Sequence, residues 1–461
     1  MNVLIWFKRD LRTADHPALA HAAGLGAVLP LYIVEPDYWA QRETSARQWE
    51  FTAECLEDLR QQLGDLGAPL LVRVGEAQAV LERICRQHNI SRIVSNAEPA
   101  VGLAAGRNQK IAHWARDAGI LWDQLPPADF RETALPAPAL VAVPGLEPGL
   151  IPSARALRLA EDRCAHRQHG GRAQALDLLE TFLCHRGETY RSASNSPLLA
   201  ERACSRLSPH LAQGSLSRRE VAQAVAARLE GRPAGLWAGA LAGFQSRLGL
   251  RDQPSAVPDP PLQSLQPASP MAELLRQTSA ATRLASWQSA ETGLPFLDAC
   301  LRYLAATGWL NFRLRALVLA CAGTHLRLDW QAAGAALAAR LTDHDPAIHL
   351  PQVQRLASDG RAQLCNPVTQ GRSLDPSGVF TRRWLPELAA VPETYLHAPW
   401  RWPGAGSVLG RRYPEPIVDL HRPSRSETRL PPRPSSPRAV ELIEPAAPPP
   451  RGRDGQLSLD L

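Results

Sequence analysis

The amino-acid sequence predicts an N-terminal α/β domain with a Rossmann-like parallel sheet, followed by a C-terminal all-helical domain. Three observations lead to this fold class. Residues 1–125 alternate short apolar runs with amphipathic stretches, and residues 126–171 are rich in Pro, Ala and Gly. From residue 172 onward strand signals vanish and helical periodicity replaces them. Alternation of strands and helices is typical of a parallel sheet that is covered by helices on its faces.

The first segment contains the expected strands and the helices between them. The expected strands are "VLIWF" (3–7), "AVLPLYIV" (27–34), "PLLVRV" (69–74), "RIVSN" (92–96) and "ILWDQL" (120–125), and the expected helices span 46–63, 77–88 and 106–119. A sheet of this kind binds ligands at the carboxyl edge of its strands. No GxGxxG string follows the first strand, so we do not expect a standard dinucleotide site there.

The remainder of the chain divides into three further parts. The composition of residues 126–171 predicts a linker that runs over the surface. Residues 172–420 predict the helical domain, because segments such as "RREVAQAVAARLE", "PFLDACLRYLAAT" and "WQAAGAALAARL" have helical periodicity. Residues 421–461 are rich in Pro, Arg and Ser and predict a disordered tail.

The composition indicates a soluble globular protein. The chain has 461 residues, of which 45% are hydrophobic, and this is enough for two or three domains. No apolar run reaches membrane-spanning length, and charges at 8–12 interrupt the N-terminus too early for a signal peptide, so we expect a cytoplasmic protein. Basic residues outnumber acidic ones by 51 to 45, which permits a polyanionic partner. The cysteines are scattered, which argues against a metal site built from paired local ligands and indicates reduced, mostly buried thiols.

The stretch "TGWLNFRLRAL" (307–317) combines a helical apolar pattern with two arginines, Arg313 and Arg315. The apolar neighbours predict that both arginines are buried. A buried guanidinium needs a carboxylate or another anion as its partner. The sequence therefore predicts an anion or a carboxylate inside the helical domain.

Longer strings resemble one family. They are "VLIWFKRDLRTADHPAL" (3–19), "CSRLSPHLAQGSLSRREV" (204–221), "WQSAETGLPFLDACLRYLAATGWLNFRLRALV" (287–318), "LTDHDPAIH" (341–349), "NPVTQGRSLDPSGVFTRRWLPEL" (366–388) and "PETYLHAPW" (392–400). In order and wording they resemble DNA photolyases and cryptochromes over roughly residues 1–420, and the bacterial photolyase-like branch in particular. The resemblance implies an N-terminal domain of the type that can hold an antenna pigment, and a helical domain that binds FAD.

The resemblance also implies which residues bind FAD. They are Tyr190, Ser205, Arg206, Leu207, Ser208, Arg313, Arg315, Asp343, Asp345 and His349. The family pairs the arginine at Arg315 with the aspartate at Asp343 beside the flavin ring, and His349 stands where many relatives have an asparagine that faces flavin N5. Ser205 and Ser208 are also good helix N-caps, and a helix start offers N–H groups to a phosphate.

Some positions depart from the family pattern. Trp330 matches the middle member of the tryptophan chain that reduces the flavin in photolyases, but Val353 and Gln277 stand where its other members are expected. Trp287 or Trp309 could offer another route, although core packing is the plainer interpretation of both. Leu250 takes the place of the tryptophan that faces the pyrimidine dimer, a catalytic carboxylate aligns near Arg247, and the loop at 361–365 is shortened.

Three functions stay open at this point, together with two further expectations. The protein is a FAD-dependent photolyase acting on pyrimidine dimers or (6–4) lesions in DNA, a cryptochrome-like flavoprotein without repair activity, or a flavin-less DNA-associated homologue. The stretch "SNAEPAVGLAAGRNQ" (95–109) lacks the groups expected for an antenna pigment, so none is assigned. The last residues, "QLSLDL" (Gln456–Leu461), resemble bacterial sliding-clamp-binding peptides. We expect a monomer.

Overall fold

The structure is a computed structural model of the chain, and it describes residues 1–99, 101–126, 132–249, 279–358, 366–418 and 420. The expectations for Leu250, Gln277, residues 361–365 and residues 421–461 lie outside these described residues. The domain boundaries after residues 125, 171 and 420 stay predictions.

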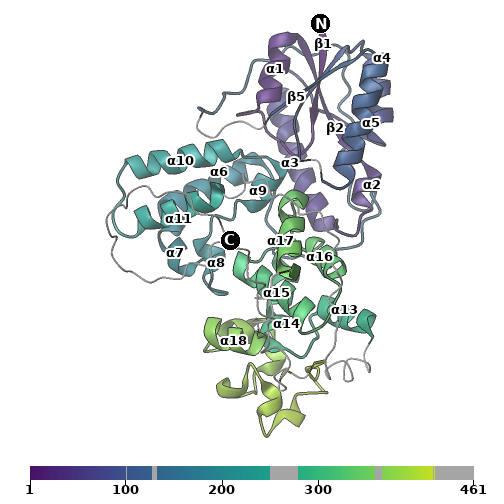
Figure 1. The fold of residues 1–461 in the computed structure, drawn as a ribbon. Coiled ribbons are helices and arrows are strands. Elements are labelled where there is room, and N and C mark those ends of the chain that lie inside the picture. Colours follow the sequence, from purple (N-terminus) through teal and green to yellow (C-terminus); the bar gives the residue numbers. More distant parts are fainter. Residues whose placement is uncertain (100, 127–131, 250–278, 359–365, 419, 421–461) are drawn as a thin grey trace, which may run out of the picture. The chain divides into compact units, whose positions relative to one another are not determined.

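The N-terminal part contains a five-stranded parallel sheet with the order β3-β2-β1-β4-β5 (Figure 1). The strands are β1 (Asn2–Phe7), β2 (Ala27–Val34), β3 (Leu71–Val74), β4 (Arg92–Asn96) and β5 (Leu121–Leu125). The predicted strands and the parallel arrangement are therefore confirmed, with small shifts at their ends.

Both faces of this sheet are covered, because successive side chains of a strand point to opposite faces. Val3, Ile5 and Phe7 pack in one core, which the helices α1 (Pro17–Leu25) and α3 (Ala46–Asp65) help to form. Leu4 and Trp6 pack in a second core with α4 (Ala77–Gln87) and α5 (Leu103–Asp117). The short helix α2 (Pro36–Trp39) follows β2. The sequence pattern predicted α3, α4 and α5 but not α1.

The described residues beyond 126 form helices and no strand. The α-helices are α6 (Arg172–Thr181), α7 (Tyr190–Ala193), α8 (Ala200–Ala203), α9 (Ser208–Gln213), α10 (Arg218–Glu230), α11 (Trp237–Gly249), α13 (Ala280–Ser289), α14 (Pro295–Thr307), α15 (Phe312–Thr324), α16 (Trp330–Ala338), α17 (Pro346–Ser358), α18 (Pro367–Leu374) and α19 (Val379–Trp384). Short turns of π- or 3-10 helix, η1 (Phe182–Arg186), η2 (Gly187–Thr189), η5 (Pro386–Leu388), η6 (Glu393–Tyr395), η7 (Pro399–Arg401) and η8 (Ala405–Ser407), complete this part. The all-helical prediction is confirmed for the described residues.

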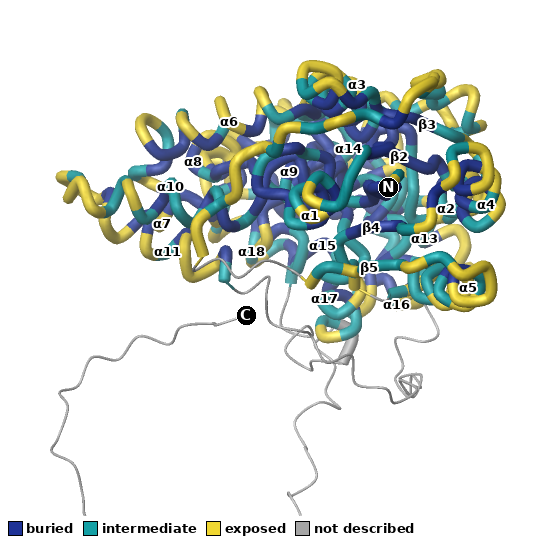
Figure 2. The backbone as a smooth tube through the Cα atoms, turned by 90° about the horizontal axis from the view of Figure 1, so that it is seen from above, coloured by how far each residue is buried: buried dark blue, intermediate teal, exposed yellow. Residues whose placement is uncertain are grey.

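One large core and one smaller core hold these helices. The large core centres on α14 and α15, and the smaller one joins α6, α10 and α11. Figure 2 shows the buried backbone gathered around α9, α14 and the strands, whereas α5 has a long exposed side. The described cysteines are free thiols, and Cys55, Cys85, Cys300 and Cys321 are buried. Within the described ranges we find no helix that is both long and apolar enough to cross a membrane.

Side chains of α3 connect the sheet domain to the helical part. Arg47 pairs with Asp162 at 2.6 Å, and its Nη1 also donates to the carbonyl oxygens of Leu304 at 3.1 Å and Arg340 at 2.8 Å. Gln48 donates to the carbonyl of Ala338 at 2.8 Å. Buried backbone carbonyls need donors. These contacts therefore fix the segments that precede α15 and α17, where the candidate site lies.

Candidate functional site

The predicted ion pair between Arg315 and Asp343 is present. Arg315, on α15, places its Nη2 2.6 Å from Oδ2 of Asp343, and its Nε donates to the carbonyl of Leu310 at 2.9 Å. The carboxylate is more deeply buried than its partner, with side-chain exposures of 3% for Asp343 and 21% for Arg315. A charge-assisted bond of this length stabilises both groups in a dry site. The rest of the guanidinium stays accessible to an anion.

The prediction that Arg313 is buried is wrong. Arg313 is exposed, and its Nη2 donates to Oε1 of Gln370 on α18 at 3.2 Å. The reason is helical geometry, because Leu314, Leu317 and Val318 form the buried stripe of α15 and Arg313 lies beside it. Arg313 is therefore more exposed than Arg315, which is itself only half-buried.

One side of α15 and much of α17 are only half-buried, although the two helices are neighbours. On α15 the half-buried residues are Arg315, Ala316 and Leu319, and on α17 they run from Pro346 to His349. Apolar side chains such as those of Ala316 and Leu319 would normally be covered. A mixed strip of apolar and charged groups of this kind can receive a cofactor.

His349 is held in one tautomer. Its Nε2 lies 2.9 Å from the carbonyl oxygen of Gly334 on α16, and a carbonyl can only accept, so Nε2 carries the proton. Burial lowers the pKa of His349, so the ring is neutral at neutral pH. Nδ1 is therefore left as a hydrogen-bond acceptor.

A second histidine, His344, lies against His349 with ring centroids 5.2 Å apart in an edge-on contact. Sequence reasoning did not single it out. Burial, with smaller contributions from His349 and Arg9, lowers the pKa of His344 to about 3. Its Nδ1 is buried and has no hydrogen-bond partner among the described residues. Such an atom marks a place where a ligand or a water can add a donor.

Asp345 has a local role in the structure. Its Oδ1 accepts from the backbone N–H of Ala347 at 3.1 Å, at the start of α17. A carboxylate at this place stabilises a helix N-terminus. Asp345 thus fixes the beginning of the helix that carries His349.

The segment from Ser205 to Ser208 precedes α9, but its serines do not cap that helix as predicted. The helix begins at Ser208, its N-cap residue is Leu207, and no side chain caps it. Ser205 Oγ instead accepts weakly from the N–H of Leu207 at 3.4 Å. Arg206 has a left-handed backbone with φ of 63°. The turn at Arg206 directs the chain into α9 before either serine can take the cap position.

Arg206 points into a site that it shares with Trp309. Its guanidinium carbon lies 4.3 Å from the centre of the indole ring, and its Nε donates to Oε1 of Gln168 at 3.1 Å. The side chain is 7% exposed. The contact brings the segment at 205–208 next to the beginning of α15.

Arg186, on η1, holds the segment that precedes α9 through hydrogen bonds to its backbone. Sequence reasoning did not predict this residue. Its Nη1 donates to the carbonyls of Arg202 at 3.0 Å and Cys204 at 2.5 Å, and its Nη2 donates to the carbonyl of Ser205 at 3.1 Å. With the carbonyls of Arg202, Cys204 and Ser205 held by one side chain, the loop is pre-shaped for a ligand. A lone arginine in "FLCHRGET" gives no sequence signal for this role.

Tyr190 begins α7 and is 7% exposed. Its ring lies edge-on against Phe182 and Phe244, and its hydroxyl accepts from Nη1 of Arg247 at 3.4 Å. Burial raises the pKa of Tyr190. The exposed Arg247, at the position where a carboxylate was expected, therefore has a structural contact with a predicted site residue.

The tryptophan positions differ in environment. Trp330 is the first residue of α16 and is half-buried. Val353 is 4% exposed, and its Cγ1 lies 3.0 Å from the point where a Cβ on Gly334 would sit. The helices α16 and α17 are therefore closely packed at Val353, with no room for an indole ring.

Trp287 and Trp309 are both core residues, with exposures of 1% and 7%. The core interpretation of these two residues is confirmed. Trp309 also contacts Tyr303 edge-on at 6.4 Å, and Tyr303 contacts the half-buried Trp384 at 5.4 Å.

Charged side chains pair with one another at the carboxyl edge of the sheet, where the strand order reverses between β1 and β4. Lys8 lies 3.2 Å from Glu98, and Arg107 pairs with Glu98 and, at 2.5 Å, with Glu35. Both cations lie over the ring of Trp6, at 4.9 and 5.0 Å. Burial lowers the pKa of Lys8 and raises that of Glu35. No antenna pigment is assigned to this edge.

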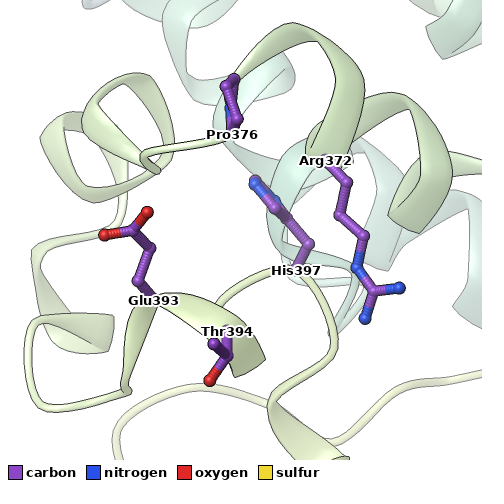
Figure 3. Close-up of a pocket in the computed structure, with 5 residues that line it drawn as sticks. All are labelled: Arg372, Pro376, Glu393, Thr394 and His397. Carbon is purple, nitrogen blue, oxygen red and sulfur yellow. The ribbon is translucent and has the colours of Figure 1, made fainter.

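Figure 3 shows a small pocket elsewhere in the helical part, lined by Arg372, Pro376, Glu393, Thr394 and His397. His397 donates from Nε2 to the carbonyl of Asp375 at 2.8 Å, and burial lowers the pKa of His397. None of the predicted site residues lines this pocket. It is separate from the strip between α15 and α17.

The fold and the site together define a class of protein: a parallel α/β domain joined to a helical domain with a buried arginine–aspartate pair. Comparison with known proteins identifies that class. The model for the family "DNA photolyase" matches residues 3–126, and the model for the "FAD binding domain of DNA photolyase" matches residues 247–429. The chain is 30% identical to the deoxyribodipyrimidine photo-lyase of Escherichia coli strain K12, over 92% of this chain and 97% of that protein. The chain belongs to the DNA photolyase and cryptochrome family and carries its FAD-binding domain.

Relatives of both functional kinds match along nearly their whole length. The cryptochrome DASH of Natronomonas pharaonis is 28% identical over 91% of this chain and 98% of that protein. Among solved structures, a class III photolyase from Agrobacterium tumefaciens has a TM-score of 0.74 and 24% identity, covering 91% of this chain and 94% of that one. A cryptochrome from Synechocystis has a TM-score of 0.75 and 23% identity, covering 91% and 97%. The two structures support the fold, and they do not separate repair from photoreception.

Proposed function

We propose that the protein is a FAD-dependent, light-driven photolyase that repairs ultraviolet pyrimidine lesions in DNA. The observation that carries the proposal is the buried Arg315–Asp343 pair, set next to the half-buried strip of α15 and α17 in a chain that has the photolyase FAD-binding domain. The chemistry that reduced FAD supplies when bound is the light-driven donation of one electron.

The described residues fit such a cofactor. His344 has a buried Nδ1 without a partner among the described residues, and the strip on α15 leaves apolar groups half-covered. Both features are what a bound planar ring with polar edges would satisfy. The residues of the site therefore agree with the family's cofactor.

Several of the predicted residues have a definable task in this proposal. Arg315 holds a positive charge in a low-dielectric site, where it favours an anionic ligand. Asp343 orients that guanidinium, and His349 offers Nδ1 as an acceptor for an N–H group of the cofactor. Arg206, held over Trp309, and the braced loop at 205–208 are suited to a phosphate.

A second candidate is a cryptochrome-like photoreceptor that binds FAD without repairing DNA. It is favoured by Val353, because a buried valine at the innermost relay position cannot pass an electron as an indole can. The flavin-less DNA-associated homologue is the third candidate. The shortened loop at 361–365 favours it, whereas Leu250, like the missing relay tryptophans, favours the photoreceptor; Leu250 and the loop both lie outside the described residues.

Purification of the full chain in the dark, followed by its visible spectrum and identification of the released chromophore, tests the proposal. Stoichiometric FAD together with blue-light-dependent loss of thymine dimers supports the photolyase. FAD without repair supports the photoreceptor. A colourless folded protein overturns both flavin proposals.

We also propose that residues Gln456–Leu461 bind a sliding clamp, that the protein is monomeric, and that it acts in the cytoplasm. Support for the clamp comes from the match of "QLSLDL" to a clamp-binding peptide pattern. Deletion of residues 456–461 should abolish capture by immobilised clamp. Undiminished capture would refute the peptide.

A further inference from the structure

The loop that follows β1 contacts the end of α9, whose last carbonyls have no partner within the helix. Nε of Arg9 donates to the carbonyl of Ala212 at 3.1 Å, and the N–H of Leu11 donates to that of Gln213 at 3.0 Å. A Cβ on Gly214 would collide with the carbonyl of Arg9. The loop and the end of α9 are therefore as close as two backbones can be.

The guanidinium of Arg9 also reaches the segment that leads into α17. Its Nη2 donates to the carbonyl oxygen of His344 at 2.7 Å. That carbonyl lies between Asp343, the partner of Arg315, and Asp345, which stabilises the start of α17. Burial lowers the pKa of Arg9, but Asp345 and other titratable neighbours raise it by more, so the guanidinium stays charged beside this carboxylate.

Arg9 therefore joins the two parts of the candidate cofactor site. One part is the loop at 205–208, which is suited to a phosphate and leads into the short helix α9. The other part is the segment at 343–345, which carries the aspartate of the buried ion pair. Arg9 belongs to neither part, because it lies in the sheet domain just after β1. A planar guanidinium can hold two carbonyls at a fixed separation.

We propose that Arg9 is a positioning residue of the cofactor site and sets the separation between the loop at 205–208 and the segment at 343–345. The inference rests on the proposed function and deepens it, because it gives the sheet domain a role in FAD binding. Arg9 does not need to touch FAD for this role. In metal sites, residues that orient the ligand-binding groups change affinity by about 10- to 100-fold, and we expect an effect of this size here.

The test measures how fast FAD leaves the full-length protein in the dark, from the rise of free-flavin fluorescence. Arg9→Gln should release FAD about 10- to 100-fold faster than the unmodified protein. Arg9→Lys should lie between the two, because one ammonium cannot replace the fork of donors. A variant that is isolated without FAD is compared by titration with FAD instead.

Chemical rescue separates positioning from a general loss of stability. Guanidinium chloride, added to Arg9→Ala below its denaturing concentration, should slow the release of FAD, because the ion can occupy the place of the lost side chain. Sodium chloride at the same concentration should have no such effect. Equal release rates in the two salts would count against the positioning role.

Arg12 provides the matched control, because it lies in the same loop and is also half-buried. Its side chain donates to the carbonyl of Gly214 at 3.0 Å and to that of Asp15 at 2.8 Å, and so holds the same loop against α9. Arg12→Gln should keep the FAD release rate of the unmodified protein. Amide hydrogen exchange of peptides covering 341–349 should be faster in Arg9→Gln than in Arg12→Gln.

The outcomes distinguish the positioning role from the proposed function. Unchanged FAD release in Arg9→Gln, or an equal acceleration in Arg12→Gln, would overturn the role of Arg9 and leave the photolyase proposal intact. An unmodified protein that binds no FAD would overturn the proposed function, and the role of Arg9 in FAD binding would fall with it.

Discussion

The Asp343 carboxylate is the most deeply buried charge of the candidate site, and Arg315 is the cation that neutralises it. Removing one member of a buried pair leaves the other charged and desolvated, which costs about 3–5 kcal/mol. The two members are unequal, because Arg315 is more accessible to water than Asp343 is. Loss of the arginine therefore harms the protein more than loss of the aspartate.

We expect both Asp343→Asn and Arg315→Gln to lose bound FAD, with the larger fall in Tm for Arg315→Gln. Absorbance at the flavin and protein bands gives the FAD content, and differential scanning fluorimetry gives Tm. Asp117→Asn is the control, since this carboxylate is 63% exposed and pairs with the exposed His113. Full FAD loading in a doubly substituted Asp343→Asn, Arg315→Gln protein would contradict the proposed site.

His344 makes the stability depend on pH. Its folded-state pKa of about 3 lies below the ordinary histidine value of 6.5, so the unfolded chain binds more protons between these values. The contribution of His344 to stability is complete above about pH 6.5 and is lost as the pH falls toward 3. The slope is about 1.4 kcal/mol per pH unit in the steep part.

Chemical unfolding from pH 7 to pH 4 measures this dependence. His344→Gln should flatten the curve relative to the unmodified protein. His113→Gln is the control, a histidine substitution at a ring that is 74% exposed. An equal slope in His344→Gln and the unmodified protein would show that this ring does not titrate on unfolding.

At the scale of elements, the close packing of α16 against α17 decides what can occupy position 353. Val353→Trp should lower the unfolding free energy by about 1–3 kcal/mol, because a larger side chain must push Gly334 and its helix away. The same substitution should not restore flavin photoreduction, since His349 depends on the Gly334 carbonyl that is displaced. Urea unfolding and photoreduction under blue light provide the two measurements.

Arg355→Trp is the matched control, because Arg355 is exposed on the same helix. It should leave the unfolding free energy within about 0.5 kcal/mol of the original value. Faster photoreduction in Val353→Trp at unchanged stability would contradict the close packing described here.

The elements show how far sequence patterns reach. Short continuous apolar runs predicted the five strands, and helical periodicity predicted α3, α4 and α5, since burial on both faces of a parallel sheet leaves a strong pattern. Helix α1 was missed, although Pro17 at its start and the capping side chain of His16 were local signals. The Arg315–Asp343 pair was predicted through a family resemblance rather than through spacing.

The two wrong predictions in the site, and the failure to predict Arg186, each have a physical cause. The buried stripe formed by Leu314, Leu317 and Val318 leaves Arg313 outside it. The prediction that Arg313 is buried was wrong because it relied on the apolar composition of the stretch and not on the position of each residue around the helix. The predicted cap at Ser208 failed because the left-handed turn at Arg206 makes Leu207 the N-cap. Arg186 could not be found, because its partners are backbone carbonyls, which every sequence has.

At the scale of the whole molecule, Arg47 joins segments that are far apart in the sequence. Its guanidinium pairs with Asp162 and donates to carbonyls before α15 and α17. We expect Arg47→Lys to lower Tm by several degrees, because one ammonium cannot replace a planar fork of donors. Arg86→Lys, in an exposed pair with Glu82, should leave Tm unchanged. Thermal unfolding with limited proteolysis compares the two, and equal Tm values would show that Arg47 does not hold the segments.

The contacts of Arg47 also matter while the ribosome is still synthesising the chain. Leu304, whose carbonyl Arg47 binds, lies 257 residues further along. At a synthesis rate of about 5–20 residues per second, a ribosome needs about 13–50 seconds to reach it. During that interval the sheet domain is already outside the ribosome. The hydrogen-bond donors of Arg47 and Gln48 then lack their acceptors, because the helical part that supplies these carbonyls has not yet been synthesised. A nascent chain stalled before residue 304 should therefore expose an interface that chaperones can recognise, and that the finished protein conceals.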